Sequence, residues 1–277
     1  MSSEVRPTIQ DGVATLTLAN PGRRNAMDLD LAAKVVAVLD EVVADENVRA
    51  VVLTGEPPSF CAGGDLTELQ DADHERLRSI YSGFLAVARC PLPTIAAVNG
   101  AAVGAGLNLA LACDVLLAGP TARFDVRFLQ LGLHPGGGFT WMIERALGGQ
   151  GARAMTLFGD VLDATEAERT GLVWRRYDSD DALLTAAREL AERAASVPRS
   201  LLETTKATMR LTAGPLSHDQ ATEIEVRAQA VSARTSHFQE RLASLRRRLS
   251  ERPAVEAGRH AGEPPQPHRS AGARPGS

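Results

Sequence analysis

The chain has 277 residues, 44% of them hydrophobic, which is enough for one large or two modest domains. Its formal net charge of -4 gives no basic surplus typical of nucleic acid binding and no acidic surplus typical of a disordered tail. Three cysteines, Cys61, Cys90 and Cys113, fit neither a disulfide framework nor a zinc site. Two of them lie in apolar runs, where we expect buried structural thiols and no bound metal.

The chain shows no pattern of secretion or membrane insertion. Its first residues lack a basic stretch followed by an apolar segment, so no signal peptide is expected. The longest apolar run, residues 92–112, is interrupted by Pro93, Asn99 and several glycines, and Asp114 follows it. We therefore predict a strand, a loop and a buried helix here, not a membrane span, and a cytoplasmic protein.

The first half of the chain alternates strand and helix patterns. Residues 5–10 and 13–18 alternate apolar and polar side chains around Asp11-Gly12, which predicts a hairpin. Asp28 is expected to cap a helix that runs to about residue 45. Residues 50–54 form a short apolar run, which predicts a strand buried on both faces.

The mixed order continues to about residue 178. The further expected elements are a loop over 55–64, helices over 76–89 and 104–112, strands over 94–98 and 115–118, helices over 140–147 and 152–158, a helix from the Asp163 cap to residue 169, and a strand over 173–177. From residue 181 onward only helical patterns remain, and prolines divide them into about three helices. The sequence thus predicts an α/β core over residues 1–180, a helical region over 181–250 and a disordered tail over 251–277.

Three segments carry a resemblance to a known family. They are Asn20-Pro-Gly-Arg-Arg-Asn-Ala-Met27, the run from Val51 to Leu66 that ends Phe-Cys-Ala-Gly-Gly-Asp-Leu, and the run from Pro93 to Asp114 that contains Ile-Ala-Ala-Val-Asn-Gly. Each is weak alone, but the three occur in order at family spacing. On these motifs the chain resembles the crotonase (enoyl-CoA hydratase/isomerase) family over roughly residues 5 to 249.

The resemblance implies a fold and an assembly. The family fold is a spiral of ββα turns, followed by a helical C-terminal region that mediates trimerisation. We therefore expect a crotonase-like α/β spiral and a homotrimer or a dimer of trimers. Our own assignment of elements supports the mixed-then-helical order and does not by itself indicate a spiral or a trimer.

The resemblance also implies an oxyanion hole for an acyl-CoA thioester. By position, its two backbone donors are the N–H groups of Ala62 and Ala105. Such donors stabilise charge on the thioester oxygen, and losing one typically costs about 3–4 kcal/mol of transition-state stabilisation. The alternative interpretation is that both are only small residues in tight turns.

Coenzyme A is expected as part of the substrate, and no separate cofactor is expected. The resemblance places the following residues near it: Arg23, Arg24, Ala26, Ala62, Gly63, Gly64 and Asp65. A guanidinium is a good phosphate partner, although both arginines could equally be solvated. Asp65 precedes a helix, and a capping role is favoured over a catalytic one.

The two glutamates that hydratases of this family use as acid and base are absent. Asn108 and Phe128 occupy their aligned positions, and neither exchanges a proton near neutral pH. General acid–base help is worth about 10²–10⁴ in rate, so ordinary hydration should be impaired. His134 is the best remaining candidate for proton transfer, with a hydrogen-bonded loop histidine as the alternative. Asp125 and Arg127 are expected to be a surface or trimer-contact pair.

Three functions remain open at this stage. The first is a lyase or isomerase on acyl-CoA with a non-standard acid/base. The second is a non-catalytic acyl-CoA binder or carrier, and the third is decarboxylation or hydrolysis of a thioester. Dinucleotide binding is disfavoured, because Gly100, Gly104 and Gly106 have the spacing G-x-x-x-G-x-G, not G-x-G-x-x-G.

Overall fold

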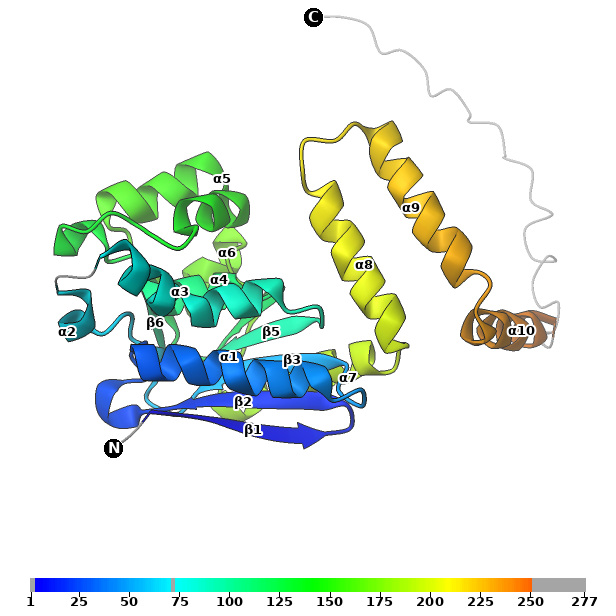
Figure 1. Cartoon of the computed structure of the whole chain (residues 1–277), viewed down its shortest axis with the longest axis horizontal. Helices are drawn as coiled ribbons and strands as arrows, with labels where there is room; N and C mark the ends of the chain where they lie inside the picture. Colours follow the sequence, from blue (N-terminus) through cyan, green and yellow to red (C-terminus); the bar gives the residue numbers. More distant parts are fainter. Residues whose placement is uncertain (1–2, 71–72, 251–277) are drawn as a thin grey trace, which may run out of the picture. The chain divides into compact units, whose positions relative to one another are not determined.

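The structure, a computed structural model, describes residues 3–70 and 73–250. The tail predicted to be disordered, residues 251–277, lies outside the described residues. The described chain forms two compact units, the first ending at Ala228 and the second beginning at Gln229. The first unit contains both sheets, so the fold is a mixed α/β architecture as predicted (Figure 1). The predicted division at residue 180 stays a prediction.

A six-stranded sheet forms the base of the first unit. Its strands, in spatial order, are β1 (Glu4–Gln10), β2 (Val13–Ala19), β3 (Ala50–Gly55), β5 (Thr94–Val98), β7 (Val115–Ala118) and β10 (Arg175–Arg176). β1 and β2 are antiparallel and are joined through Asp11 and Gly12, both at positive φ, which confirms the predicted hairpin. The other neighbouring pairs are parallel. Strand β10 is shorter than the predicted 173–177.

Helices cover both faces of this sheet. α1 (Leu29–Ala44) and α3 (His74–Arg89) run side by side on one face (Figure 1), and α7 (Asp180–Ala195) packs on the other, against β3 and β5. Val51 and Leu53 pack in the cluster of α1 and α3, whereas Ala50 and Val52 pack against α7. Strand β3 is therefore buried on both faces, as predicted.

A second sheet, of four short strands, was largely missed from the sequence. Its order is β4 (Ser59–Cys61), β6 (Ala101–Val103), β8 (Arg123–Asp125) and β9 (Leu162–Asp163). β4 lies within the predicted loop over residues 55–64. A strand of three residues is too short to show an alternating pattern, so only its pairing with a neighbour identifies it.

The remaining elements follow the predicted order with local differences. They are η1 (Pro21–Arg23), α2 (Leu66–Leu69), α4 (Ala105–Leu111), η2 (Leu129–Leu131), α5 (Phe139–Phe158), α6 (Ala164–Thr170), α8 (Arg199–Thr212), α9 (His218–Ser232) and α10 (Ser236–Ser250). The predicted helices over 140–147 and 152–158 form one element, interrupted at Gly148, whose φ is 66°. Four helices, not three, follow residue 179 in the described chain. Asp28 and Asp163 cap their helices as predicted.

Side chains of α8 bind backbone carbonyls of the core. Arg199 Nη2 donates to the Val43 carbonyl oxygen at 2.6 Å, and Arg210 Nη2 donates to that of Ala88 at 2.7 Å. These carbonyls lie near the C-terminal ends of α1 and α3, where unsatisfied acceptors are expected. Within the described residues, no helix is long and apolar enough to cross a bilayer.

Candidate functional site

Two adjacent parallel strands bring two glycine-containing turns together. β4 and β6 pair with Cys61 opposite Ala102, so the segments after these strands, residues 62–65 and 104–105, emerge at one edge. The approach is close, because a Cβ built on Gly106 would lie 2.0 Å from the Cys61 carbonyl oxygen. Only glycine fits there without movement of the backbone, so close packing explains why the motif has glycine at position 106.

These turns line a cavity of about 320 Å³. Its other walls come from α2, α3, α4 and the segment 126–133, and most of the side chains are apolar. The lining residues are Arg24, Ala62, Gly63, Gly64, Leu66, Leu69, Ile80, Tyr81, Ala101, Val103, Gly104, Ala105, Asn108, Val126, Arg127, Phe128, Leu131 and Leu133. A concave, largely apolar site with a few polar groups is the usual form of a small-molecule site.

The Ala62 N–H is not available to a ligand. It donates to the Arg24 carbonyl oxygen at 3.0 Å, which argues against its predicted role as an oxyanion donor. Two residues later, the N–H of Gly64 has no acceptor among the described residues. Gly64 lies opposite Met27 in a parallel β-bridge, but the hydrogen bonds of this bridge are made by the neighbours of Gly64. The Met27 N–H donates to the Gly63 carbonyl at 2.7 Å, and the Asp65 N–H donates to the Met27 carbonyl at 2.9 Å. Gly64 is therefore an unpaired donor of this turn, and the N–H of Gly63 likewise has no acceptor among the described residues.

The second turn provides the other unpaired donor. Ala105 is the first residue of α4, and the N–H of a first helical residue has no partner within the helix. No other described residue accepts from it, and Ala105 lines the same cavity as Gly64. The N-terminal end of the helix adds positive potential at this point. The lining residues thus include at least one unpaired backbone donor on each of two adjacent turns.

Asp65 caps α2 and does not line the cavity. Its carboxylate accepts from the N–H groups of Thr67 and Glu68 at 2.9 and 3.2 Å, which confirms the capping interpretation. It also pairs with Arg23. Burial raises the pKa of this carboxyl, but the two N–H donors and the Arg23 charge outweigh burial, so its pKa lies below the ordinary value.

The first loop contributes Arg24 to the site. Arg23 is bound to Asp65 and to Asp28, the latter at 3.3 Å, so its charge is used within the protein. Arg24 is exposed, lines the cavity and forms no ion pair among the described residues. Ala26 is not among the lining residues, and its N–H donates to the Arg23 carbonyl at 3.1 Å.

Asn108 and Phe128 lie in the wall of the same cavity. Asn108 is 1% exposed, and its Nδ2 donates to the Gly136 carbonyl oxygen at 3.0 Å. The ring of Phe128 packs against Phe139, with centroids 5.5 Å apart. The structure thus brings together the two positions that the resemblance predicts for the family's acid and base. Among the described lining residues, none carries a carboxylate, an imidazole or a thiol.

His134 is not part of this cavity. Its side chain is exposed, and its Nδ1 lies 2.7 Å from the carbonyl oxygen of Pro135. The alternative interpretation, a hydrogen-bonded loop histidine, describes it better than proton transfer. Asp125 is buried and paired with Arg127, whose side chain lines the cavity. That ion pair leaves neither group free as an acid or base.

Tyr81 of α3 is a polar cavity residue that the sequence motifs do not predict. Its hydroxyl has no hydrogen-bond partner among the described residues, and burial raises its pKa. Its ring packs on Phe84, with centroids 5.3 Å apart. The available signal was small: it is one of only two tyrosines in the chain, on a helix with an apolar face.

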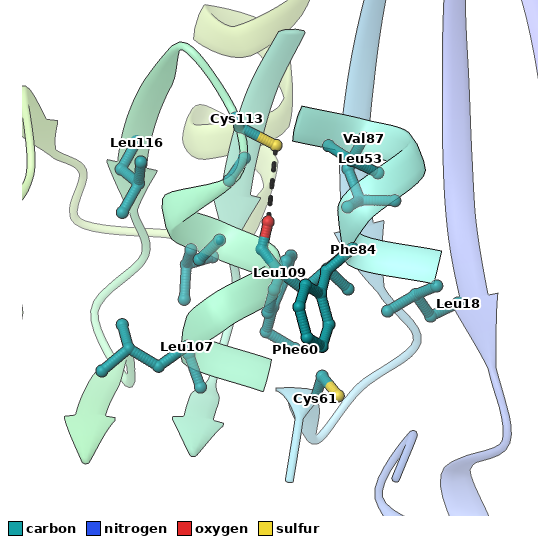
Figure 2. Packing of buried hydrophobic residues seen from close by; sticks show 14 of the residues in the cluster. Leu18, Leu53, Phe60, Cys61, Phe84, Val87, Leu107, Leu109, Cys113 and Leu116 are labelled. Atoms are coloured by element: carbon teal, nitrogen blue, oxygen red, sulfur yellow. Dashed lines mark hydrogen bonds between the residues drawn. The ribbon is translucent and has the colours of Figure 1, made fainter. Parts of the chain in front are cut away.

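Cys61 lies beneath the first turn, and its side chain is buried. Figure 2 shows it in the buried cluster with Phe60 and Phe84. Burial raises the pKa of its thiol to about 11, so almost no thiolate forms near neutral pH. Cys90 and Cys113 are also buried, and the Cys113 thiol donates to the Leu109 carbonyl at 3.8 Å (Figure 2). The prediction of buried thiols is confirmed.

The family model and the similar proteins identify the same family for this chain. Residues 8–251 match the family model described as Enoyl-CoA hydratase/isomerase. The chain is similar to "Probable enoyl-CoA hydratase EchA14" of Mycobacterium tuberculosis H37Rv, 48% identical over 250 residues that cover 87% of this chain and 96% of that protein. It is also similar to the 1,2-epoxyphenylacetyl-CoA isomerase of Escherichia coli K12, 35% identical over 69% of this chain and 75% of that protein.

Solved structures show the same fold. The crystal structure of an enoyl-CoA hydratase from Polaromonas sp. JS666 superposes with a TM-score of 0.82 at 29% identity, covering 88% of this chain and 97% of that one. The enoyl-CoA hydratase from Bacillus anthracis gives a TM-score of 0.80 at 27% identity, covering 90% and 97%.

Proposed function

Because this chain belongs to the enoyl-CoA hydratase/isomerase (crotonase) family, we propose that the cavity beside β4 and β6 binds the acyl thioester of an acyl-CoA. The single observation that carries this proposal is the pair of unpaired backbone donors, Gly64 N–H and Ala105 N–H, on adjacent turns of that cavity. We assign them, in place of the predicted Ala62 and Ala105, to the oxyanion hole.

The chemistry of this pair is electrostatic. When a thioester passes to an enolate, negative charge develops on its carbonyl oxygen, and two fixed donors stabilise that charge without reorganising. The surrounding walls are apolar, which strengthens each interaction by lowering the local dielectric. Arg24, exposed at the cavity and free of an ion pair among the described residues, is placed to bind a phosphate of the CoA moiety.

The reaction we favour is a lyase or isomerase reaction on acyl-CoA with a non-standard acid/base. The family position of the first acid/base is Asn108, and that of the second is Phe128. Ordinary hydration should be slow, because neither side chain transfers protons and no carboxylate among the described residues lines the cavity. One relative is named as an isomerase of an epoxy acyl-CoA, so the family includes reactions other than hydration.

A specific observation favours a second function, a non-catalytic acyl-CoA binder. The cavity has both backbone donors but no carboxylate, imidazole or thiol among its described lining residues. A protein that holds and presents a thioester needs the donors and does not need the acid or base.

One experiment tests binding and separates the two functions. Calorimetry should give a higher affinity for acyl-CoA than for free CoA, and equal affinities would contradict the proposal. Incubation with saturated acyl-CoAs and enoyl-CoAs, followed by mass spectrometry of the products, then decides between them. Turnover of any thioester supports the enzyme, and binding without turnover supports the carrier.

Ala105→Pro offers a sharper test of the donor pair. Proline removes the N–H yet is favoured at the first position of a helix, so α4 should still start at this residue. We expect acyl-CoA turnover to fall by about 10²-fold or more. The control is Ala105→Gly, which keeps the N–H and should retain activity. Equal rates in the two variants would contradict the assignment of Ala105.

A further inference from the structure

Two side chains from different helices meet one short segment of the cavity wall. Asn108 of α4 donates through Nδ2 to the Gly136 carbonyl oxygen at 3.0 Å. The Tyr81 hydroxyl of α3 lies against the same residue, because a Cβ built on Gly136 would be 2.1 Å from that oxygen. Any side chain at position 136 would displace the phenol. The glycine therefore leaves room for both polar groups at one place.

Each of these side chains has an unused polar atom. The Tyr81 hydroxyl makes no hydrogen bond to any described residue. Asn108 Oδ1 is buried and also has no donor among the described residues. The bond from Nδ2 to the Gly136 carbonyl fixes the amide orientation, since a flipped amide would set two oxygens against each other. A buried acceptor without a donor destabilises the protein, and Asn108 is 1% exposed.

The rest of the described lining offers no comparable group. Arg127 is paired with Asp125, and Arg24 is an exposed cation. The neighbouring walls at Ile80, Phe128 and Leu133 are apolar. Tyr81 and Asn108 are thus the uncharged polar side chains of the described lining, and they provide one O–H donor and one acceptor.

We propose that Tyr81 and Asn108 form a specificity-determining pair that binds a hydroxyl group on the acyl portion of the ligand, separate from its thioester oxygen. This inference rests on the proposed acyl-CoA function and names the substituent that the site selects. The phenol donates to the ligand oxygen, and the ligand O–H donates to Asn108 Oδ1.

The pair selects a hydroxyl because both hydrogen bonds have a required direction. A keto oxygen accepts from Tyr81 but has no proton for Asn108 Oδ1. A carboxylate also lacks that proton and would place negative charge beside the amide oxygen. Burial raises the pKa of Tyr81, which keeps the phenol protonated and able to donate. A site built around a hydroxyl rejects analogues that leave its buried polar atoms unpaired.

The test compares affinities for free CoA, butyryl-CoA, 3- and 4-hydroxybutyryl-CoA and acetoacetyl-CoA by calorimetry. We expect the wild type to bind at least one of the hydroxybutyryl thioesters about 10-fold more tightly than butyryl-CoA and acetoacetyl-CoA. Tyr81→Phe removes only the hydroxyl, which has no hydrogen-bond partner among the described residues, and keeps the ring against Phe84. This variant should lose most of the 10-fold preference, because the hydroxybutyryl thioesters should weaken more than butyryl-CoA.

The matched control is Tyr177→Phe, because Tyr177 is the only other tyrosine in the sequence and does not line the cavity. It should leave the preference intact. The inference is wrong if butyryl-CoA outbinds free CoA but a hydroxyl adds nothing. It is also wrong if Tyr81→Phe weakens butyryl-CoA and the hydroxybutyryl thioesters equally, as expected for a bound water or for packing alone. If butyryl-CoA binds no better than CoA, the proposed function itself fails and the inference fails with it.

Discussion

Lys206 of α8 forms an ion pair with Asp114, a residue that precedes it by 92 positions. The lysine is 7% exposed, and its Nζ also donates to the Leu92 carbonyl oxygen at 2.6 Å. Asp114 in turn accepts from the N–H and the hydroxyl of Thr94, at 2.7 and 2.9 Å. The Lys206 ammonium therefore connects α8 to Asp114, the residue before β7, and through Asp114 to Thr94 at the start of β5.

Lys206→Met should destabilise the protein by about 1–3 kcal/mol, because it leaves the Leu92 carbonyl and one side of Asp114 without a donor. Urea unfolding followed by circular dichroism measures this change. Lys34→Met is the control, since Lys34 is the other lysine in the sequence and its pair with Asp30 is exposed. Its cost should be clearly smaller. Equal costs would show that the contacts of the buried Lys206 add no more stability than those of Lys34.

Asp65→Asn should change how stability depends on pH. The pKa of Asp65 is lowered in the folded state, so its carboxylate stabilises the fold above the unfolded pKa near 4, and this contribution is lost as the pH falls through the folded value. The asparagine side chain can still cap α2. The wild type should therefore be the more stable at pH 6, and the difference should shrink toward pH 3. A difference in unfolding free energy that is constant with pH would contradict the assigned ion pair.

The three thiols should be unreactive in the folded protein. With its pKa raised to about 11, Cys61 has a thiolate fraction of only about 10⁻³ at pH 8, and burial also raises the pKa of Cys90 and Cys113. We expect slow reaction with Ellman's reagent in buffer and release of three equivalents in denaturant. Rapid reaction of one thiol in buffer would reveal an accessible cysteine.

Restoring carboxylates should restore hydration. Asn108→Glu with Phe128→Glu should gain crotonyl-CoA hydration, since each positioned group contributes about 10²–10⁴ in rate, and Asn108→Glu alone should gain less. Phe128→Glu also removes packing on Phe139 and costs about 3–5 kcal/mol, so stability is measured in parallel. His134→Ala should leave the rate unchanged, because His134 does not line the cavity. Hydration at ordinary family rates by the wild type would contradict the assignment of positions 108 and 128.

The assembly prediction is tested by light scattering at micromolar concentration. The helical region carries apolar residues that include Leu201, Met209 and Val226, and we expect a trimer or a dimer of trimers. A monomer at this concentration would contradict the prediction.

Local patterns in the sequence determined most of the first sheet and its helices. The hairpin at Asp11-Gly12 and the caps at Asp28 and Asp163 depend on turn chemistry and on a single side chain bonding to nearby N–H groups. β3 could be recognised as buried on both faces because its apolar run is continuous. All these features are encoded within a few residues, so they can be identified without the tertiary structure.

The site depended on contacts between distant segments. The family resemblance implies Ala62 as a donor, and only the hydrogen bond from its N–H to the Arg24 carbonyl, made across two loops, leads us to propose Gly64 instead. Likewise, proximity along the chain favours His134 as the site residue, whereas Tyr81 reaches the cavity because α3 packs beside α4. Whether a polar atom is already bonded within the fold depends on which segments meet, and tertiary packing alone decides that.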